Sequence, residues 1–151
     1  MTTITIRDAE PADMAVLSAV FRRSSLSVDA DRAHLLAHPE TLDLADTGVS
    51  EGRTRAAVAS GRIIGFATWL RDGDALELDD LFVDPDWMGQ GAGLALVGDV
   101  VARARSLGLR RVQVLANPSA LGFYARAGFV AGDETGTRFG PAIRMHLELA
   151  E

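Results

Sequence analysis

Alternating apolar and polar positions predict strands in the N-terminal and central parts of the chain. Residues 2–7 and the first part of residues 75–83 alternate in this way, and residues 53–59 and 62–70 are short, mainly apolar stretches that also predict strands. The Asp72-Gly73 pair between the last two stretches is a strong hairpin signal. The three central strands are therefore expected to form an antiparallel meander.

A longer spacing of apolar residues predicts the helices. A first helix begins near Pro11, since proline is favoured in the first turn of a helix. A short helix is expected over residues 29–37, and residues 38–52 are expected to form a loop. Residues 91–107 predict a long amphipathic helix. Its expected buried face consists of Leu94, Val97, Val101 and Ala104.

The C-terminal part combines both patterns. Residues 110–115 predict a strand, and Asn117-Pro118 starts a short helix that Gly128 ends. Residues 129–133 and 143–149 predict two closing strands. A chain of 151 residues is expected to form one domain. The fold class is then α+β, with the order β-α-α-β-β-β-α-β-α-β-β.

The third strand of the meander contains an irregularity. Leu76 and Leu78 face one side of the strand. Glu77 and Asp79 face the other side. Strict alternation would then bury Asp80, whereas one extra residue at this point returns Leu81 and Val83 to the apolar face. This pattern predicts a β-bulge, whose unpaired backbone groups could hydrogen-bond an extended ligand.

A glycine-rich turn, Met88-Gly89-Gln90-Gly91-Ala92-Gly93, lies between this strand and the long helix. Glycines at alternate positions let backbone N–H groups point outward together. The helix that starts there adds its unpaired N–H groups and the positive end of its dipole. The turn is therefore typical of an anion site, most often for a phosphate.

Composition narrows the chemistry at that turn. The chain has no cysteine, which excludes a cysteine nucleophile, an acyl-cysteine intermediate and thiolate metal ligands. All 15 basic residues are arginine, so the lysine of a P-loop is missing. A Rossmann fingerprint would need a third small residue where Leu94 stands. A nucleotide-binding protein is therefore disfavoured.

Charge and hydropathy set the expected partners and location. The formal net charge of −6, with no basic patch, argues against nucleic acid. The N-terminus lacks an apolar signal segment, and no run approaches the roughly 18 apolar residues of a membrane span. The scattered His34, His38 and His146 show no metal-ligand spacing. We expect a soluble, cytoplasmic protein that binds neither membrane nor metal.

Two segments together resemble the GNAT superfamily of acyl-CoA N-acyltransferases. The family's turn reads Arg/Gln-x-x-Gly-x-Gly/Ala; the glycine-rich turn matches both small positions and departs from the first, where Met88 stands. Downstream, residues 117–129 resemble the family's Asn-x-x-Ala-x-x-Phe-Tyr-x-x-x-Gly-Phe segment. The resemblance covers nearly the whole chain in element order. It implies a twisted, mostly antiparallel sheet of about seven strands, with a bulge and splayed central strands, flanked by about four helices.

The resemblance also implies acetyl-CoA as the cofactor, with CoA as the product. The pyrophosphate would bind the backbone amides of the glycine-rich turn and of Leu94. The pantetheine arm would lie along the backbone of Leu81, Phe82 and Val83, and Asn117 would help to bind CoA. A backbone N–H at the bulge, such as that of Val83, would polarise the acetyl carbonyl.

The reaction implied by the family is direct transfer of an acetyl group to a primary amine of a small molecule or peptide, through a ternary complex. The amine must lose a proton before or during attack. Glu77 matches the position where several members carry a glutamate base; Asp79 and a water chain remain alternatives. Tyr124, the sole tyrosine, stands where members carry the acid that protonates the departing thiolate.

A second hypothesis is a catalytically silent acyl-CoA-binding domain with a sensing role. The presence of both Glu77 and Tyr124 favours the enzyme. The family binds its acceptor largely through segments that correspond to residues 22–52 and 135–141, and these carry no chemical signature of a particular amine. A homodimer, which is common in the family, is a further expectation.

Overall fold

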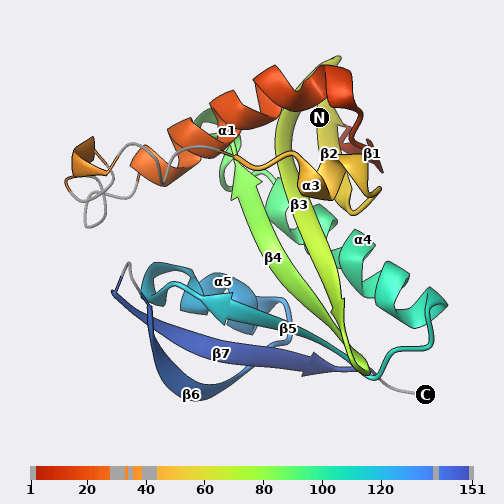
Figure 1. Ribbon diagram of the computed structural model, residues 1–151, viewed down its shortest axis with the longest axis vertical. Helices are drawn as coiled ribbons and strands as arrows, with labels where there is room; N and C mark the ends of the chain where they lie inside the picture. Colours follow the sequence, from red (N-terminus) through yellow and green to blue (C-terminus); the bar gives the residue numbers. More distant parts are fainter. Residues whose placement is uncertain (1–2, 28–32, 34–35, 39–43, 138–139, 150–151) are drawn as a thin grey trace. The chain divides into compact units, whose positions relative to one another are not determined.

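The structure is a computed structural model that describes residues 3–27, 33, 36–38, 44–137 and 140–149. Hydrogen bonding orders seven strands as β1-β2-β3-β4-β5-β7-β6 in one sheet (Figure 1). Pairing is antiparallel for β1–β2, β2–β3, β5–β7 and β6–β7, and parallel for β4–β5. The predicted mixed fold with a mostly antiparallel, seven-stranded sheet is confirmed.

The element bounds follow the predicted order closely. The strands are β1 (Thr5–Asp8), β2 (Thr54–Ala59), β3 (Arg62–Asp72), β4 (Ala75–Val83), β5 (Arg111–Ala116), β6 (Val130–Thr137) and β7 (Gly140–Glu148). The α-helices whose bounds are described are α1 (Met14–Leu26), α3 (Thr47–Ser50), α4 (Ala92–Ser106) and α5 (Leu121–Arg126). In the part of the chain that the structure describes, three 3-10 turns precede helices or the glycine-rich turn: η1 (Pro11–Asp13), η3 (Pro85–Trp87) and η4 (Pro118–Ala120).

The chain divides into two compact units. The N-terminal unit comprises Met1–Thr68 and Asp80–Leu96, and the C-terminal unit comprises Trp69–Asp79 and Val97–Glu151. The elements β3, β4 and α4 each contribute residues to both units.

The core of the N-terminal unit lies between α1 and the strands beside it (Figure 1). Leu17 and Val20 of α1 are buried in one apolar cluster with Ala56 of β2 and Phe66 of β3. Phe82 of β4 joins this cluster, and its ring centroid lies 5.6 Å from that of Phe66. Phe82 therefore faces an apolar layer, although the sequence pattern assigned only its two neighbours to an apolar face.

A β-bulge lies in β3, where the sequence pattern gives no sign of one. The register with β2 shifts between Ala57 and Val58, which pair with Gly65 and Ile63 and leave Ile64 as the extra residue. A Cβ atom on Gly65 would lie 2.9 Å from the carbonyl oxygen of Phe82, so only glycine fits there without a shift. The bulge predicted within β4 is not tested by the described pairings and stays a prediction.

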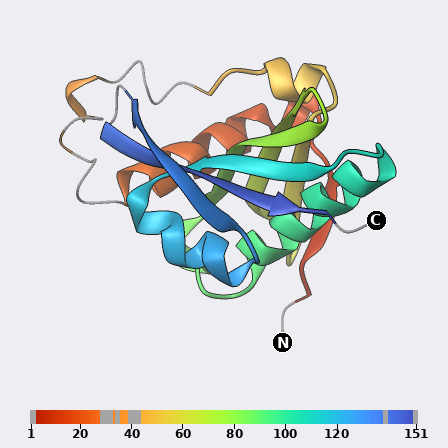
Figure 2. The same cartoon turned by 90° about the horizontal axis from the view of Figure 1, so that it is seen from below.

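The buried face of the C-terminal unit follows from strand register. Leu76 pairs with Val112, and Leu78 pairs with Val114, so these four buried side chains share one face of β4 and β5. Helix α5 contacts β6 in this unit (Figure 2).

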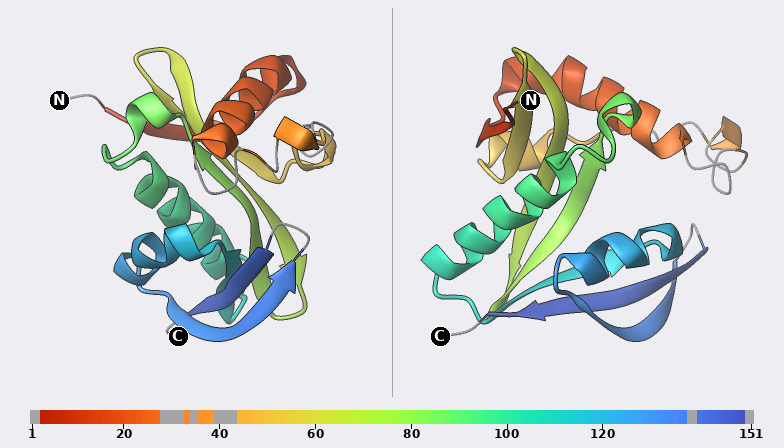
Figure 3. Two further views of the ribbon diagram at one scale, coloured as in Figure 1. Left: turned by 90° about the vertical axis from the view of Figure 1, so that its left-hand side faces the viewer. Right: turned by 180° about the vertical axis from the view of Figure 1, so that it is seen from behind.

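Helix α4, which Figure 3 shows from two sides, begins at Ala92, within the last residues of the glycine-rich turn. Its long apolar face is confirmed, but its angular position is shifted from the predicted one. Leu94 is 50% exposed and is wrongly placed on the buried face. The buried positions are instead Ala92, Leu96, Val97, Val100, Val101 and Ala104. The predicted set caught three of them, because positions three and four apart fit more than one choice of face.

Two further segments differ from the predictions, and a third is largely untested. Strand β1 begins at Thr5, later than predicted. The stretch predicted as a loop over residues 38–52 contains helix α3, whose four residues are too short to show helical periodicity. The helix predicted over residues 29–37 falls largely outside the described residues, as does His34.

Candidate active site

The glycine-rich turn has the backbone conformation that its glycines predict. Gly89 and Gly91 have φ values of 77° and 94°, a region that side chains disfavour. Ala95 N–H donates to the Gly91 carbonyl at 2.9 Å, so α4 follows at once. Turn and helix together thus present unpaired N–H groups and a positive dipole end in the N-terminal unit.

Side chains around this turn point largely to solvent. Met88, which stands where the resembling family has Arg or Gln, is 57% exposed, and Gln90 is exposed with its amide 3.4 Å from the Asp86 carbonyl oxygen. Gly93 is half-buried and Ala92 is fully buried at the start of α4. An anion bound here would therefore meet backbone amides, because the turn itself carries no cationic side chain.

Strand β4 leads into the turn through Leu81, Phe82 and Val83, which are all half-buried. The described pairing of β4 with β5 ends at Leu78 and Val114. Within the described residues, Leu81, Phe82 and Val83 are not among the positions of β4 that pair with β5. This is the segment predicted to lie along the pantetheine arm.

Glu77, the first candidate base, is engaged on both carboxylate oxygens. Its Oε1 accepts hydrogen bonds from Gln113 Nε2 at 2.8 Å and from Arg144 Nη1 at 2.7 Å, and the same arginine nitrogen lies 2.9 Å from Oε2. The Glu77 side chain is 18% exposed. The carboxylate is therefore held in a partly buried ion pair that links β4, β5 and β7.

Strand register explains why these groups meet. Glu77 pairs with Gln113 across β4 and β5, and Gln113 pairs with His146 across β5 and β7. The three residues form a row on the face of the sheet opposite the buried leucines and valines. Arg144 lies two residues before His146 on the same face. His146 is half-buried there.

Asp79, the second candidate base, differs from Glu77 in its surroundings. It lies two residues further along β4 and is exposed. Among the residues that the structure describes, Asp79 has no hydrogen-bond or ion-pair partner. Its lone pairs are therefore open to solvent and to a ligand.

Tyr124 lies on α5 with its ring buried between two phenylalanines. The ring centroids of Phe123 and Phe129 lie 5.1 Å and 5.4 Å away, both in edge-to-face geometry. Burial raises the pKa of the Tyr124 hydroxyl well above its usual range. The phenol therefore keeps its proton at neutral pH, as a proton donor must.

Asn117 has a structural role at the start of η4. Its Oδ1 accepts hydrogen bonds from the backbone N–H of Ser119 at 3.0 Å and from the Ser119 hydroxyl at 2.9 Å. This is the N-cap that the Asn-Pro pair predicts. Cofactor contact by Asn117 stays a prediction.

The described ranges hold no cluster of three or more residues suited to a metal ion. No described helix has the length and apolar character that a membrane crossing requires.

Sequence reasoning missed two arginines that organise these segments. Arg144 binds Glu77, and Arg23 of α1 binds Asp84 and Asp86 at the entrance to the glycine-rich turn. Neither contact has a sequence signal, because each joins residues more than 60 positions apart. The alternation of β7 could have placed Arg144 on a face, but it could not have named its partner.

The fold has a close counterpart among solved structures. A GCN5-related N-acetyltransferase from Rhodopseudomonas palustris superposes with a TM-score of 0.81 at 25% identity, covering 99% of this chain and 98% of that one. The PaiA N-acetyltransferase of Thermoplasma acidophilum, solved in complex with coenzyme A, has a TM-score of 0.75 at 18% identity and covers 97% and 99%. At that identity the second likeness shows the fold alone.

Sequence comparison identifies the family. Glucosamine 6-phosphate N-acetyltransferase of Trypanosoma brucei brucei is 30% identical over 113 residues, which are 65% of this chain and 77% of the relative. With another curated N-acetyltransferase, the match spans only 35% of the relative's length. The acetyltransferase (GNAT) family model matches residues 22–129. Because this match covers more than half of the sequence, the chain belongs to the acetyltransferase (GNAT) family.

Proposed function

We propose that this protein is an N-acetyltransferase that moves an acetyl group from acetyl-CoA to a primary amine of a small molecule or peptide. The observation that carries the proposal is the glycine-rich turn, with Gly89 and Gly91 at positive φ directly before α4. Its outward N–H groups suit the diphosphate of CoA. Family membership and the coenzyme A complex of the Thermoplasma acidophilum structure support the choice of cofactor.

The proposed reaction is a direct transfer in a ternary complex. The amine nitrogen attacks the thioester carbonyl carbon and gives up a proton to a base, and the carbon–sulfur bond then breaks. The departing thiolate takes a proton from the Tyr124 hydroxyl. Burial raises the pKa of this hydroxyl, so the group is protonated at neutral pH and can donate a hydrogen bond to the sulfur, and the proton passes as the carbon–sulfur bond breaks.

Two carboxylates compete for the role of base. Glu77 already accepts hydrogen bonds from Gln113 and Arg144. A base needs an available lone pair within reach of the amine, and the exposed Asp79 offers one. The hydrogen bonds of Glu77 and the exposure of Asp79 therefore favour Asp79 as the base, acting directly or through water. Glu77 then has a structural role, in which it links β4, β5 and β7 through Gln113 and Arg144.

The test is a thiol-release assay with acetyl-CoA and a panel of primary amines: a polyamine, an arylalkylamine, an amino sugar and a peptide N-terminus. We expect at least one amine to drive CoA release above the rate of hydrolysis. Tyr124→Phe keeps the ring and removes the proton donor, so kcat should fall about a hundredfold while acetyl-CoA affinity is kept.

An unchanged kcat in Tyr124→Phe would overturn the assignment of the acid. Tight acetyl-CoA binding with no turnover on any amine would instead favour the silent acyl-CoA-binding domain.

A further inference from the structure

Asp84 is a buried carboxylate at the junction between β4 and the glycine-rich turn. The residue is 5% exposed. Its backbone N–H donates to the Ile64 carbonyl at 2.7 Å, and its Oδ1 accepts from the backbone N–H of Asp86 at 3.0 Å. Asp84 thus ties the entrance of the turn to β3 and caps η3.

Arg23 connects this junction to the last turn of α1. Its Nη1 donates to Asp84 Oδ2 at 3.0 Å, and its Nη2 donates to Asp86 Oδ2 at 2.8 Å. The guanidinium therefore bridges two carboxylates that lie two residues apart. This geometry uses the planar fork of arginine, which a lysine cannot reproduce.

The two carboxylates matter because the glycine-rich turn comes next in the chain. Asp84 and Asp86 stand directly before a turn suited to an anion, and each carboxylate would repel a diphosphate bound there. The turn carries the neutral Met88 and no cationic side chain of its own. In the described contacts, Arg23 is the cation that bonds both carboxylates.

We propose that Arg23 is a positioning residue for the CoA diphosphate, acting through Asp84 and Asp86. It fixes the entrance of the turn and offsets the negative charge beside it, so that the backbone amides of residues 89–93 can accept the diphosphate. This inference rests on the proposed use of acetyl-CoA. It adds a residue of α1 to the machinery that binds the donor.

The first experiment measures CoA binding by titration calorimetry for the wild type and for Arg23→Gln at low and high salt. We expect Arg23→Gln to weaken CoA binding about three- to tenfold, with a larger loss at low ionic strength, where exposed charges are least screened. Arg22→Gln removes the same charge from the same helix and should bind CoA as the wild type does. In turnover, the KM for acetyl-CoA should rise more than kcat falls.

Two further single variants keep the test decisive if Arg23→Gln folds poorly, and a double variant extends it if Arg23→Gln folds well. Asp86→Asn removes a carboxylate that is 78% exposed, so the variant should fold and should bind CoA at least as tightly as the wild type. Arg23→Lys keeps the charge without the fork and should bind CoA with intermediate affinity. Adding Asp86→Asn to Arg23→Gln should restore part of the lost affinity.

Equal CoA affinity in the wild type, Arg23→Gln and Arg22→Gln would overturn the role of Arg23 and leave the proposed function standing. Weaker binding in Asp86→Asn would overturn the electrostatic argument. No binding of CoA to the wild type would overturn the proposed function, and this inference with it.

Discussion

Glu77 and Asp79 show how partners, rather than position, separate two carboxylates of one strand. Both lie on β4 at alternate positions, and the sequence cannot distinguish them. In the structure, Glu77 bonds Gln113 and Arg144, while Asp79 is exposed. A resemblance to a family can suggest which residue type stands at a position. It cannot identify the hydrogen-bond partners of that residue, because they lie on strands far away in the sequence.

The two carboxylates should therefore respond differently to amide substitution. Asp79→Asn should lower kcat/KM for the amine about a hundredfold, as expected for loss of a general base. The loss should shrink at high pH, where more of the acceptor amine is already neutral. Glu77→Gln should instead lower the free energy of unfolding by about 1 kcal/mol, because it breaks a partly exposed ion pair. Steady-state kinetics and urea unfolding on the same preparations measure both effects.

The effects of the two substitutions on turnover would be exchanged if Glu77 were the base. Turnover would then collapse in Glu77→Gln and survive in Asp79→Asn.

Tyr124 can be titrated directly because it is the sole tyrosine of the chain. Burial raises the pKa of its hydroxyl. The tyrosinate absorbance of the folded protein should therefore appear only at a pH well above the usual midpoint of about pH 10. Between that midpoint and the folded pKa, the unfolded chain releases the proton and the folded chain keeps it. Stability should therefore fall as pH rises through this window. A midpoint near pH 10 in the folded protein would show that the phenol is not desolvated.

Among the helices and strands, the spacing of apolar residues predicted most elements and their order. The pairing register of the strands was visible only in the structure. The bounds of β4 match the prediction, β2 begins one residue later than predicted, and β5 is shifted by one residue at both ends. The bulge in β3 was missed because that strand is buried on both faces around Gly65 and lacks alternation. Helix α3 was missed because a single turn has no period to detect.

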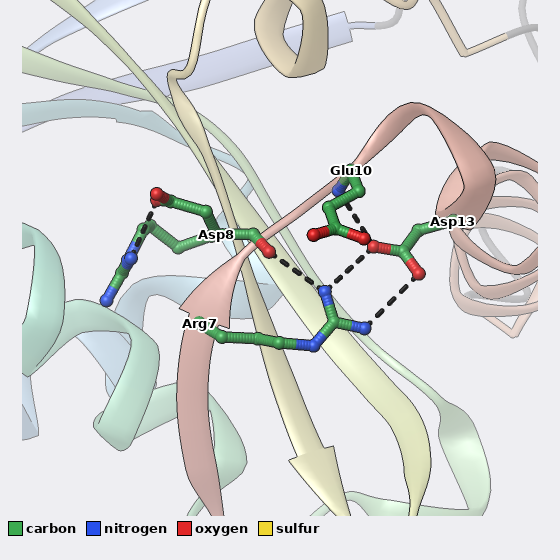
Figure 4. A network of polar contacts seen from close by, with 5 residues as sticks. Arg7, Asp8, Glu10 and Asp13 are labelled. Carbon is green, nitrogen blue, oxygen red and sulfur yellow. Dashed lines mark hydrogen bonds and ion pairs between the residues drawn. The ribbon is translucent and has the colours of Figure 1, made fainter.

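The start of α1 is held by a polar network that the sequence analysis did not identify (Figure 4). The Arg7 guanidinium donates to both oxygens of Asp13 at 2.8 Å and 3.2 Å, and the Glu10 backbone N–H donates to the same carboxylate at 2.8 Å. The hydrogen bonds from Arg7 and then from the Glu10 amide lower the pKa of Asp13. The network thus joins β1 to η1 and to the helix after it.

Asp13→Asn should lower the free energy of unfolding at neutral pH by about 0.5–1 kcal/mol, the range for a half-exposed ion pair with a capping bond. A lowered folded pKa stabilises the protein above the usual aspartate pKa of about 4 and loses this effect as pH falls through the folded value. The difference between wild type and variant in urea unfolding should therefore vanish in acid. Asp8→Asn, which breaks the exposed ion pair with Arg55, is the control for loss of an ion pair without a capping bond. A difference that persists in strong acid would contradict the account.

At the scale of the whole molecule, the sequence was sufficient for the family and not for the acceptor. The glycine-rich turn and the Asn117–Phe129 segment carried the resemblance, and the family match over residues 22–129 agrees with it. The segments that would bind the acceptor carry no motif that identifies a particular amine. Part of one of them, residues 22–52, also lies outside the described residues. The cytoplasmic location, the homodimer and the single domain stay predictions.

Use of acetyl-CoA is tested first by calorimetric titration of the wild-type protein with acetyl-CoA, with free CoA and ATP as comparisons. We predict that acetyl-CoA and CoA bind and that ATP does not, because the turn lacks the lysine of a nucleotide-binding loop. At a hundred times its dissociation constant, acetyl-CoA should also add about 2.7 kcal/mol to the free energy of unfolding. Failure of both CoA species to bind would contradict the account and would mean that a turn with Met88 at its first position does not hold the diphosphate.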